Sequence, residues 1–245
     1  METGSVDTNV KIRIFLLAGG KGERLYPYTD IMDKSLLPVY NKPAIRHIVD
    51  NILNSNIIID KIVVCCLKKF EPLFKHEFRD CPKVITYAAE EPLGTLGHIL
   101  QCYNDGLITD NDIILIHYAD CMIKADYDKL IILAKDKGTT ILVSNNVNSE
   151  YSRVKFRMNK IVGFKEKGKI PYYTWTGVMS MRGKDLREFS NNMPEKPDFA
   201  IDLFPRLVKE GRLYYIMTDK SWIDIGNIRS YRIACQLAEE GKLFL

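Results

Sequence analysis

Three glycines stand within four positions near the start of the chain, Gly19, Gly20 and Gly22, and two cations, Lys21 and Arg24, stand among and after them. Glycine lets the backbone turn tightly with its N–H groups directed inward, and such a concave turn binds anions. Arginine can hold two phosphate oxygens at once. The combination predicts a polyphosphate-binding loop, although many glycine-rich turns are only turns. Neither a P-loop nor the third glycine of a dinucleotide fingerprint is present.

Two aspartates are candidates for a metal site. Asp120 follows the apolar run 112–117, and Asp224 lies between Trp222 and Gly226. Proteins usually hold Mg²⁺ with one or two carboxylates together with the phosphates of a substrate. Each aspartate could instead be an ordinary turn or capping residue. Acting together, the two carboxylates would complete a magnesium site beside a bound polyphosphate.

The stretch 90–97 (EEPLGTLG) is a candidate for binding a flat ligand. A rigid Pro92, a small Gly94 and Thr95 suit a close backbone approach, and backbone groups and a threonine can read the edge of a base. The alternative is an ordinary turn into the helix that follows.

Lys34 lies just downstream of the glycine loop, where a lysine is usually solvated unless it meets a phosphate. Glu166 and Lys167 lie in a charged run, which is normally a solvated face. His47 and His98 lie on predicted helices and have no partner at metal-ligand spacing, so we interpret both as structural.

Alternating strands and helices position these residues. Apolar β-type runs predict strands at 12–17, 61–67, 84–88, 112–117 and 139–144. Helices are expected between them, the first capped by Asn41, and then at 70–78, 98–103 and 127–135. This order predicts an α/β fold with a Rossmann-like, mostly parallel mixed sheet and helices on both faces. The glycine loop, the 90–97 loop and Asp120 each follow a different strand, so they should meet at one rim.

The pattern changes after Asn146. A hairpin is predicted over 153–165, followed by a strand at 173–181, a helix at 184–189 and a helical piece at about 200–209. A strand at 213–217 and a helix at 230–240 complete the series. We expect one domain over residues 11–245, preceded by a disordered tail over residues 1–10.

Composition narrows the class of protein. The chain has 245 residues, 46% of them hydrophobic, and a formal charge of +4, which favours an acidic small molecule but is too weak to argue for nucleic acid. Six cysteines without zinc spacing predict reduced thiols. Neither a signal-peptide-like segment nor a run of membrane-spanning length is present, so we expect a cytoplasmic protein without a membrane partner.

With these motifs in order, the chain resembles the sugar-1-phosphate nucleotidylyltransferases (nucleotide-sugar pyrophosphorylases), in a short form without their β-helix extension. The resemblance covers nearly all of the chain after the tail. The stretch 17–25 (LAGGKGERL) matches the signature loop around the nucleotide phosphates, Lys34 matches the lysine at the reaction centre, and Asp120 and Asp224 match the metal-binding aspartates. Tyr118 and Ala119 depart from the usual asparagine and glycine.

The resemblance implies a role for each candidate residue. Arg24, Lys34 and Asp120 would be catalytic, and Asp120 and Asp224 would hold Mg²⁺. Residues 11–146 would form a nucleotide-binding half and 147–245 a sugar-phosphate-binding half. The nucleotide would contact Leu17, Ala18, Gly19, Gly20, Gly22, Arg24, Glu90, Pro92, Gly94 and Thr95. The sugar phosphate would contact Glu166, Lys167, Thr176 and Gly177.

The implied reaction joins a nucleoside triphosphate and a sugar 1-phosphate and releases pyrophosphate. The 90–97 loop favours GTP with a mannose- or heptose-type phosphate. Uridylyl, cytidylyl or thymidylyl transfer, to another sugar 1-phosphate or to phosphocholine, is the alternative. A catalytically silent homologue that binds nucleotide sugars is a second alternative, but it predicts damaged metal or phosphate positions. A glycosyltransferase would usually need an Asp-x-Asp motif, which positions 118–120 do not supply. A homo-oligomer is left open.

Overall fold

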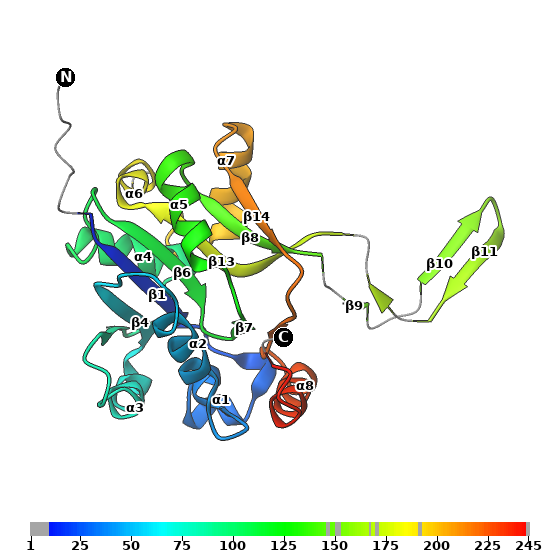
Figure 1. Cartoon of the computed structure of the whole chain (residues 1–245), viewed down its shortest axis with the longest axis horizontal. Coiled ribbons are helices and arrows are strands. Elements are labelled where there is room, and N and C mark those ends of the chain that lie inside the picture. The colour runs from blue at the N-terminus through cyan, green and yellow to red at the C-terminus, as the bar shows by residue number, and fades with distance from the viewer. Residues whose placement is uncertain are drawn as a thin grey trace.

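The structure, a computed structural model, describes residues 10–145, 148–149, 153–166, 168–169, 172–190 and 193–243. Its centre is a seven-stranded sheet in the order β14-β8-β13-β6-β1-β4-β5 (Figure 1). These strands are β1 (Ile12–Ala18), β4 (Lys61–Leu67), β5 (Val84–Ala89), β6 (Ile113–Tyr118), β8 (Thr140–Ser144), β13 (Thr174–Arg182) and β14 (Tyr214–Thr218). The strands β5, β4, β1 and β6 are parallel, and β14 is parallel to β8, whereas β13 runs antiparallel between β6 and β8. The predicted mostly parallel mixed sheet is confirmed.

Helices cover both faces of the sheet, which explains the continuous apolar runs in β1 and β4. Ile14 and Leu16 of β1 pack into a cluster with α2 (Ala44–Leu53), α3 (Glu71–Glu77) and α5 (Tyr127–Lys137). Phe15 and Leu17 point to the opposite face, because successive strand side chains alternate. They pack with α4 (Thr95–Asn104), α6 (Gly183–Phe189) and α7 (Phe204–Lys209).

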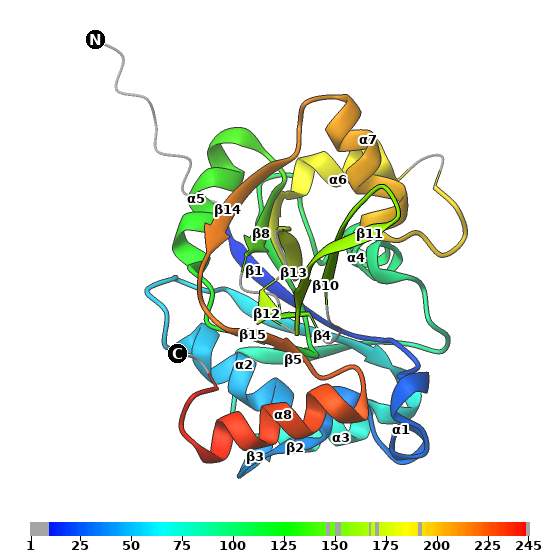
Figure 2. The same cartoon turned by 90° about the vertical axis from the view of Figure 1, so that its right-hand side faces the viewer.

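A third, smaller core lies beside the last helix, α8 (Ile228–Glu239). Met122, Ile225 and Ala234 are buried in it. It supports two short ladders, β2 (Pro38–Val39) with β3 (Lys42–Pro43), and β7 (Cys121–Ile123) with β15 (Trp222–Asp224). Figure 2 shows α8 beneath β15 and beside β2 and β3. This core therefore supports β15, which carries Asp224, and β7, which Asp120 directly precedes.

A hairpin projects from the body between β8 and β13 (Figure 1). It consists of β10 (Arg153–Arg157) and β11 (Lys160–Lys165), paired antiparallel, as the sequence predicts. At its base β9 (Asn148–Ser149) pairs with β12 (Gly168–Lys169). We call residues 153–165 the arm.

Some local predictions are wrong. The helix expected at Asn41 begins at Ala44, with Pro43 in the capping position, because residues 38–43 form the β2–β3 turn instead. By contrast, the helical piece expected at about 200–209 is confirmed: it consists of a π-helical turn, η4 (Phe199–Leu203), followed directly by α7. Four short turns of helix were not predicted: η1 (Glu23–Leu25), α1 (Tyr28–Ile31), η2 (Lys34–Leu36) and η3 (Lys68–Phe70).

The outer limits of the fold stay predictions. Residues 1–9 lie outside the described residues, so the predicted tail is not tested. The division into a nucleotide-binding and a sugar-phosphate-binding half is also a prediction. Within the part of the chain that the structure describes, no helix is both long enough and apolar enough to cross a membrane.

Candidate active site

A cavity of about 150 Å³ lies where β1, β5 and β6 end. We call it the inner cavity. Eight of its lining residues are among the predicted site residues, namely Leu17, Gly19, Gly20, Lys34, Pro92, Gly94, Thr95 and Asp120. His98 and Tyr118 complete the lining. The parallel strands thus bring three loops, separate in sequence, to one rim, as expected from ligand sites in such sheets.

The glycine loop packs directly on His98. A Cβ atom on Gly19 would lie 2.3 Å from Cε1 of that ring, so any side chain there would force the ring or the loop to shift. His98 is 3% exposed, its Nδ1 lies 3.3 Å from the carbonyl oxygen of Gly94, and burial lowers its pKa. The ring is therefore neutral and packs between the glycine loop and the 94–95 turn. Gly19 is needed because only glycine allows the loop to approach the ring this closely.

The 94–95 turn is held by a segment more than 100 residues away. Gly94 adopts φ +81°, and a Cβ atom there would lie 2.4 Å from the carbonyl oxygen of Pro197. The hydroxyl of Thr95 donates to Asp198 Oδ2 at 2.7 Å and accepts from the backbone N–H of Phe199 at 3.1 Å. Residues 197–199 therefore fix the turn that begins α4.

The β7–β15 ladder places the two candidate metal ligands beside each other. The backbone N–H of Ile225 donates to the carbonyl oxygen of Asp120 at 3.0 Å, directly after the pairing of Asp224 with Cys121. The backbone N–H of Gly226 donates to Asp224 Oδ1 at 2.5 Å and orients that carboxylate. Two carboxylates that are more than 100 residues apart in the sequence are thus held side by side by a ladder of three residue pairs.

Lys34 joins this pair through an ion pair with Asp120 Oδ2. It stands at the start of η2, where the Asp33 carboxylate accepts from the backbone N–H of Ser35 at 2.8 Å and from its hydroxyl at 2.7 Å. This cap fixes the turn and so the direction of the lysine.

Charge shapes the protonation of the cluster. Burial lowers the pKa of Lys34, but the carboxylates of Asp120, Asp33 and Asp224 outweigh it, so the pKa lies above its ordinary value and the ammonium stays charged. Burial, and then the charge of Asp120, raise the pKa of Asp224. Burial raises the pKa of Asp33 to about 6. The cluster thus consists of two carboxylates that repel each other and a cation paired with one of them.

The residues fit a divalent cation. Asp120 and Asp224 are near enough for one carboxylate to raise the pKa of the other, which is a site where a positive ion relieves repulsion. Oxygen ligands suit Mg²⁺, which is commonly held by one or two carboxylates and substrate phosphates. Among the described residues no cluster of three or more His, Cys, Asp or Glu could hold a metal by itself. Such a site would need oxygen ligands from a substrate or water as well.

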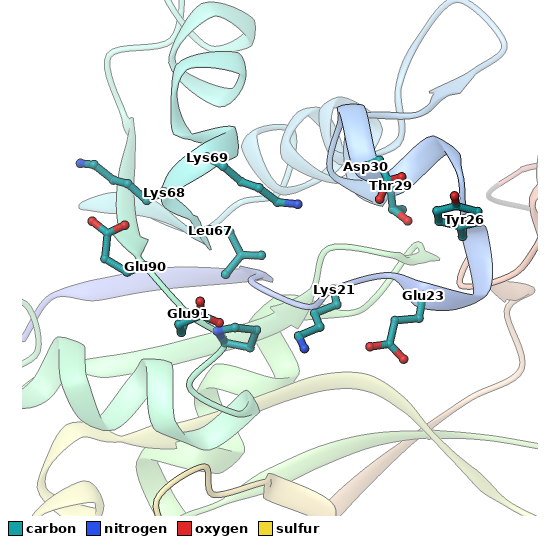
Figure 3. Close-up of a pocket in the computed structure, with 11 residues that line it drawn as sticks. Lys21, Glu23, Tyr26, Thr29, Asp30, Leu67, Lys68, Lys69, Glu90 and Glu91 are labelled. Atoms are coloured by element: carbon teal, nitrogen blue, oxygen red, sulfur yellow. The ribbon is translucent and has the colours of Figure 1, made fainter.

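A second cavity of about 710 Å³, the outer cavity, meets the inner one at Pro92, which lines both. Figure 3 shows Lys21 of the glycine loop and Lys69 of η3 on two sides of Leu67, with Glu90 beside Lys68. The predicted nucleotide contact Glu90 thus lines the outer cavity rather than the inner one.

Comparison with known proteins gives the family. The chain matches the nucleotidyl transferases over residues 14–241. It belongs to the nucleotidyl transferase family. The resemblance to sugar-1-phosphate nucleotidylyltransferases is thereby confirmed, since relatives with such activities in their names match most of this chain.

Three relatives illustrate the range of this family. The chain is 26% identical to the bifunctional protein GlmU of Methanococcus maripaludis, over 86% of the chain and 51% of the relative, so it spans about half of that protein's length. It is 26% identical to the D-glycero-alpha-D-manno-heptose 1-phosphate guanylyltransferase of Aneurinibacillus thermoaerophilus, over 89% of the chain and 95% of the relative. It is 28% identical to the mannose-1-phosphate guanyltransferase of Saccharomyces cerevisiae, over 88% and 62%.

Two solved structures share the fold. One is a putative glucose-1-phosphate thymidylyltransferase from Bacillus anthracis, with a TM-score of 0.75, 22% identity and coverage of 94% of this chain and 96% of that one. The other is HddC from Yersinia pseudotuberculosis complexed with GMP-PN, with a TM-score of 0.66, 21% identity and coverage of 91% and 98%. Both likenesses support the single-domain α/β architecture of this nucleotidyl transferase.

Several predicted site residues lie outside the inner cavity. Ala18 is buried in the core, and Gly22 shapes the loop, where its carbonyl oxygen accepts from the hydroxyl of Thr29 at 3.1 Å. Arg24 lies beside Asp224, since a Cβ atom on Gly226 would be 2.8 Å from its guanidinium.

The predicted sugar-side residues are divided in the nucleotidyl transferase fold. Thr176 is buried and its hydroxyl donates to the carbonyl oxygen of Leu142 at 3.1 Å. Gly177 adopts φ +80° against Tyr118 and Cys121, next to the candidate metal site. Glu166 follows β11 at the base of the arm and lines neither cavity. Lys167 lies outside the described residues.

Sequence reasoning noted Tyr118 but missed the aromatic wall that its ring forms with Trp175 and Phe204 beside the inner cavity. The ring of Tyr118 meets that of Trp175 edge-on, with centroids 5.1 Å apart, and Trp175 meets Phe204 at 4.8 Å. Burial raises the pKa of the Tyr118 phenol, against a hydrogen bond with Thr95. The departure from the family pattern at Tyr118 was the signal that could have pointed here, whereas Asp198 and Trp175 carried none.

Proposed function

We propose that the chain catalyses the formation of an NDP-sugar and pyrophosphate from a nucleoside triphosphate and a sugar 1-phosphate. The observation that carries this proposal is the convergence of Lys34, Asp120 and Asp224 beside the cavity enclosed by the glycine loop. A cation and two carboxylates next to a concave run of backbone N–H groups suit the transfer of a nucleotidyl group between phosphates.

The chain's own residues supply position and charge. Backbone N–H groups of Gly19 and Gly20, with Arg24, hold the phosphates of the nucleotide. The sugar phosphate oxygen attacks the α-phosphorus in line, and a new P–O bond forms. The bond from the α-phosphorus to the oxygen that bridges to the β-phosphorus breaks, and pyrophosphate leaves with that oxygen and its electron pair. Lys34 exchanges Asp120 for the phosphate oxygens and neutralises the charge that collects on them.

Asp120 and Asp224 would hold Mg²⁺. When bound, the ion neutralises charge on the phosphates that it touches. Asp224 is kept in place for this by the N–H of Gly226 and by the β7–β15 ladder.

We propose that the substrates are GTP and a mannose- or heptose-type phosphate, so that the reaction is a guanylyl transfer. A guanylyltransferase for a heptose phosphate matches this chain along 95% of its own length, and a second guanylyltransferase is 28% identical. A uridylyltransferase from Synechocystis is 25% identical over 90% of the chain, so uridylyl transfer is the alternative. The aromatic wall of Tyr118 and Trp175 would limit the size of the acceptor.

The test is pyrophosphate release with Mg²⁺, measured for ATP, GTP, CTP, UTP and dTTP, each crossed with a panel of sugar 1-phosphates and phosphocholine. Release that requires one nucleotide and one acceptor together supports the transferase and names both substrates. Release from UTP but not GTP would overturn the choice of base. Nucleotide-sugar binding without release from any pair would indicate the silent homologue instead.

A further inference from the structure

The arm has one apolar and one basic face. Val154 pairs with Phe164 across the two strands, and Phe156 pairs with Ile161, so these four side chains share a face. The alternate positions Lys155, Arg157, Lys160 and Lys165 give the opposite face four cations. Residues 153–165 contain no aspartate or glutamate.

The apolar face is open to solvent. Phe156 is 77% exposed, Phe164 68% and Ile161 69%. An aromatic side chain has a surface area of about 150–250 Å². At these exposed fractions the two phenylalanines alone expose roughly 300 Å². Val154, Met158, Ile161 and Val162 bring the apolar surface of the arm to the order of 600 Å², the size at which such patches mark interaction sites. A lone two-stranded hairpin is also only marginally stable in water. The arm therefore needs a covering surface.

The body carries an apolar groove near the root of the same arm. Tyr215 and Met217 of β14, Ile141 and Val143 of β8, and Tyr173 line this groove, which has a volume of about 410 Å³. Tyr215 is 61% exposed, and β14 forms one edge of the sheet as far as the described residues go. Tyr173 stands where the chain returns from the arm into β13, so groove and arm are parts of one surface.

The arm cannot cover the groove of its own chain in this arrangement, because it points away from the sheet (Figure 1). A second copy of the chain can. We propose that the protein is a homodimer in which the apolar face of each arm lies in the β14 groove of the other copy. The two copies are then related by a two-fold axis. Each arm covers the groove of the other copy, so both arms and both grooves are buried and the dimer is closed.

The areas suit such a dimer. Two arms and two receiving grooves would together remove on the order of 2,000 Å² from solvent, the lower end of the range for permanent dimers. The four cations lie on the back of the ribbon, opposite the apolar face, and stay in solvent when that face is covered. Lysines on the exposed back also discourage further strand pairing.

The first test is the mass of the full chain in solution, by sedimentation equilibrium between about 1 and 100 µM. The proposal predicts a dimer, and it predicts that Phe156→Glu with Phe164→Glu raises the dissociation constant at least 100-fold. The matched control is Lys155→Ser with Arg157→Ser on the other face of the same strand, which should leave the dimer intact. A wild-type monomer at all concentrations overturns the proposal, and so does a dimer that survives the two glutamates. Unchanged circular dichroism shows that each variant is folded.

The second test identifies the contact. Cys81 and Cys235, the two cysteines that are not buried, are first changed to serine. Under oxidation, Phe156→Cys combined with Tyr215→Cys should give a disulfide-linked dimer, and neither single variant should. Cross-linking by Phe156→Cys alone would mean that the arms pack on each other, which contradicts the proposal. A monomer that sediments with anionic phosphatidylserine vesicles would also contradict it.

Discussion

Substituting alanine for Gly19 tests the packing that encloses the inner cavity. The new Cβ atom would lie 2.3 Å from Cε1, 2.8 Å from Nε2 and 3.2 Å from Nδ1 of the His98 ring. The ring is buried beside the inner cavity, so the ring itself, the glycine loop or the first turn of α4 must shift. Overpacking of this kind costs about 1–3 kcal/mol. For a chain of this length each kcal/mol lowers the melting temperature by about 2–4 °C.

The neighbouring glycine is the matched control. A Cβ atom on Gly20 would meet no described atom within 4 Å, so Gly20→Ala should change the free energy of unfolding by less than about 0.5 kcal/mol. Urea unfolding of both variants measures the difference. A double-mutant cycle with His98→Ala then isolates the contact, because removing the ring removes the clash.

Gly19→Ala should lower the free energy of unfolding less in the His98→Ala background than in the wild type. We expect the two losses to differ by at least about 1 kcal/mol. Equal effects of Gly19→Ala and Gly20→Ala, or strict additivity in the cycle, would refute this account of the loop.

Three further predictions concern the turn of α4, a buried histidine and the metal. Thr95→Val should lower the free energy of unfolding by about 1–3 kcal/mol, because Asp198 and the N–H of Phe199 lose their partner. Urea unfolding measures this loss. In kinetic assays of the same variant, the KM for the nucleotide should rise more than kcat falls. Burial lowers the pKa of His117 from 6.5 to about 4, so the unfolded chain takes up the proton first as pH falls. Relative to His117→Asn, the wild type should lose stability from about pH 6.5 downward, by about 3 kcal/mol in total near pH 4. If the difference between the urea midpoints of the two proteins stayed constant from pH 7 to about 4.5, this prediction would be contradicted. Chelation with EDTA should abolish pyrophosphate release and excess Mg²⁺ should restore it, whereas release that persists after chelation would remove the metal from the site.

Much of the nucleotide side of the site follows from the sequence. The strands β1, β4, β5 and β6 are continuous apolar runs because helices cover both faces of the sheet, and such runs are easy to find. Once they are taken as parallel, the glycine loop, the 94–95 turn and Asp120 must meet at one rim.

The remaining contacts depend on long-range packing that leaves no local pattern. The β7–β15 ladder that joins Asp120 to Asp224 is three residues long, too short for its periodicity to be recognised. Asp198 reaches Thr95 across 103 residues, and the contact of His98 with Gly19 depends on where α4 begins. The hairpin of the arm could be predicted from its two strands, but not where it points.

Replacing Asp120 by asparagine tests the central proposal most directly, by removing one carboxylate charge from the cluster with Lys34 and Asp224. The matched control is Asp126→Asn, because asparagine also serves as the cap that Asp126 forms on the N–H of Lys129 at 3.0 Å. With the best nucleotide and acceptor pair, Asp120→Asn should slow pyrophosphate release by about 10²–10³ while remaining folded. Asp126→Asn should be as fast as the wild type. Near-normal turnover in a folded Asp120→Asn protein would contradict the assignment of this cluster as the catalytic centre.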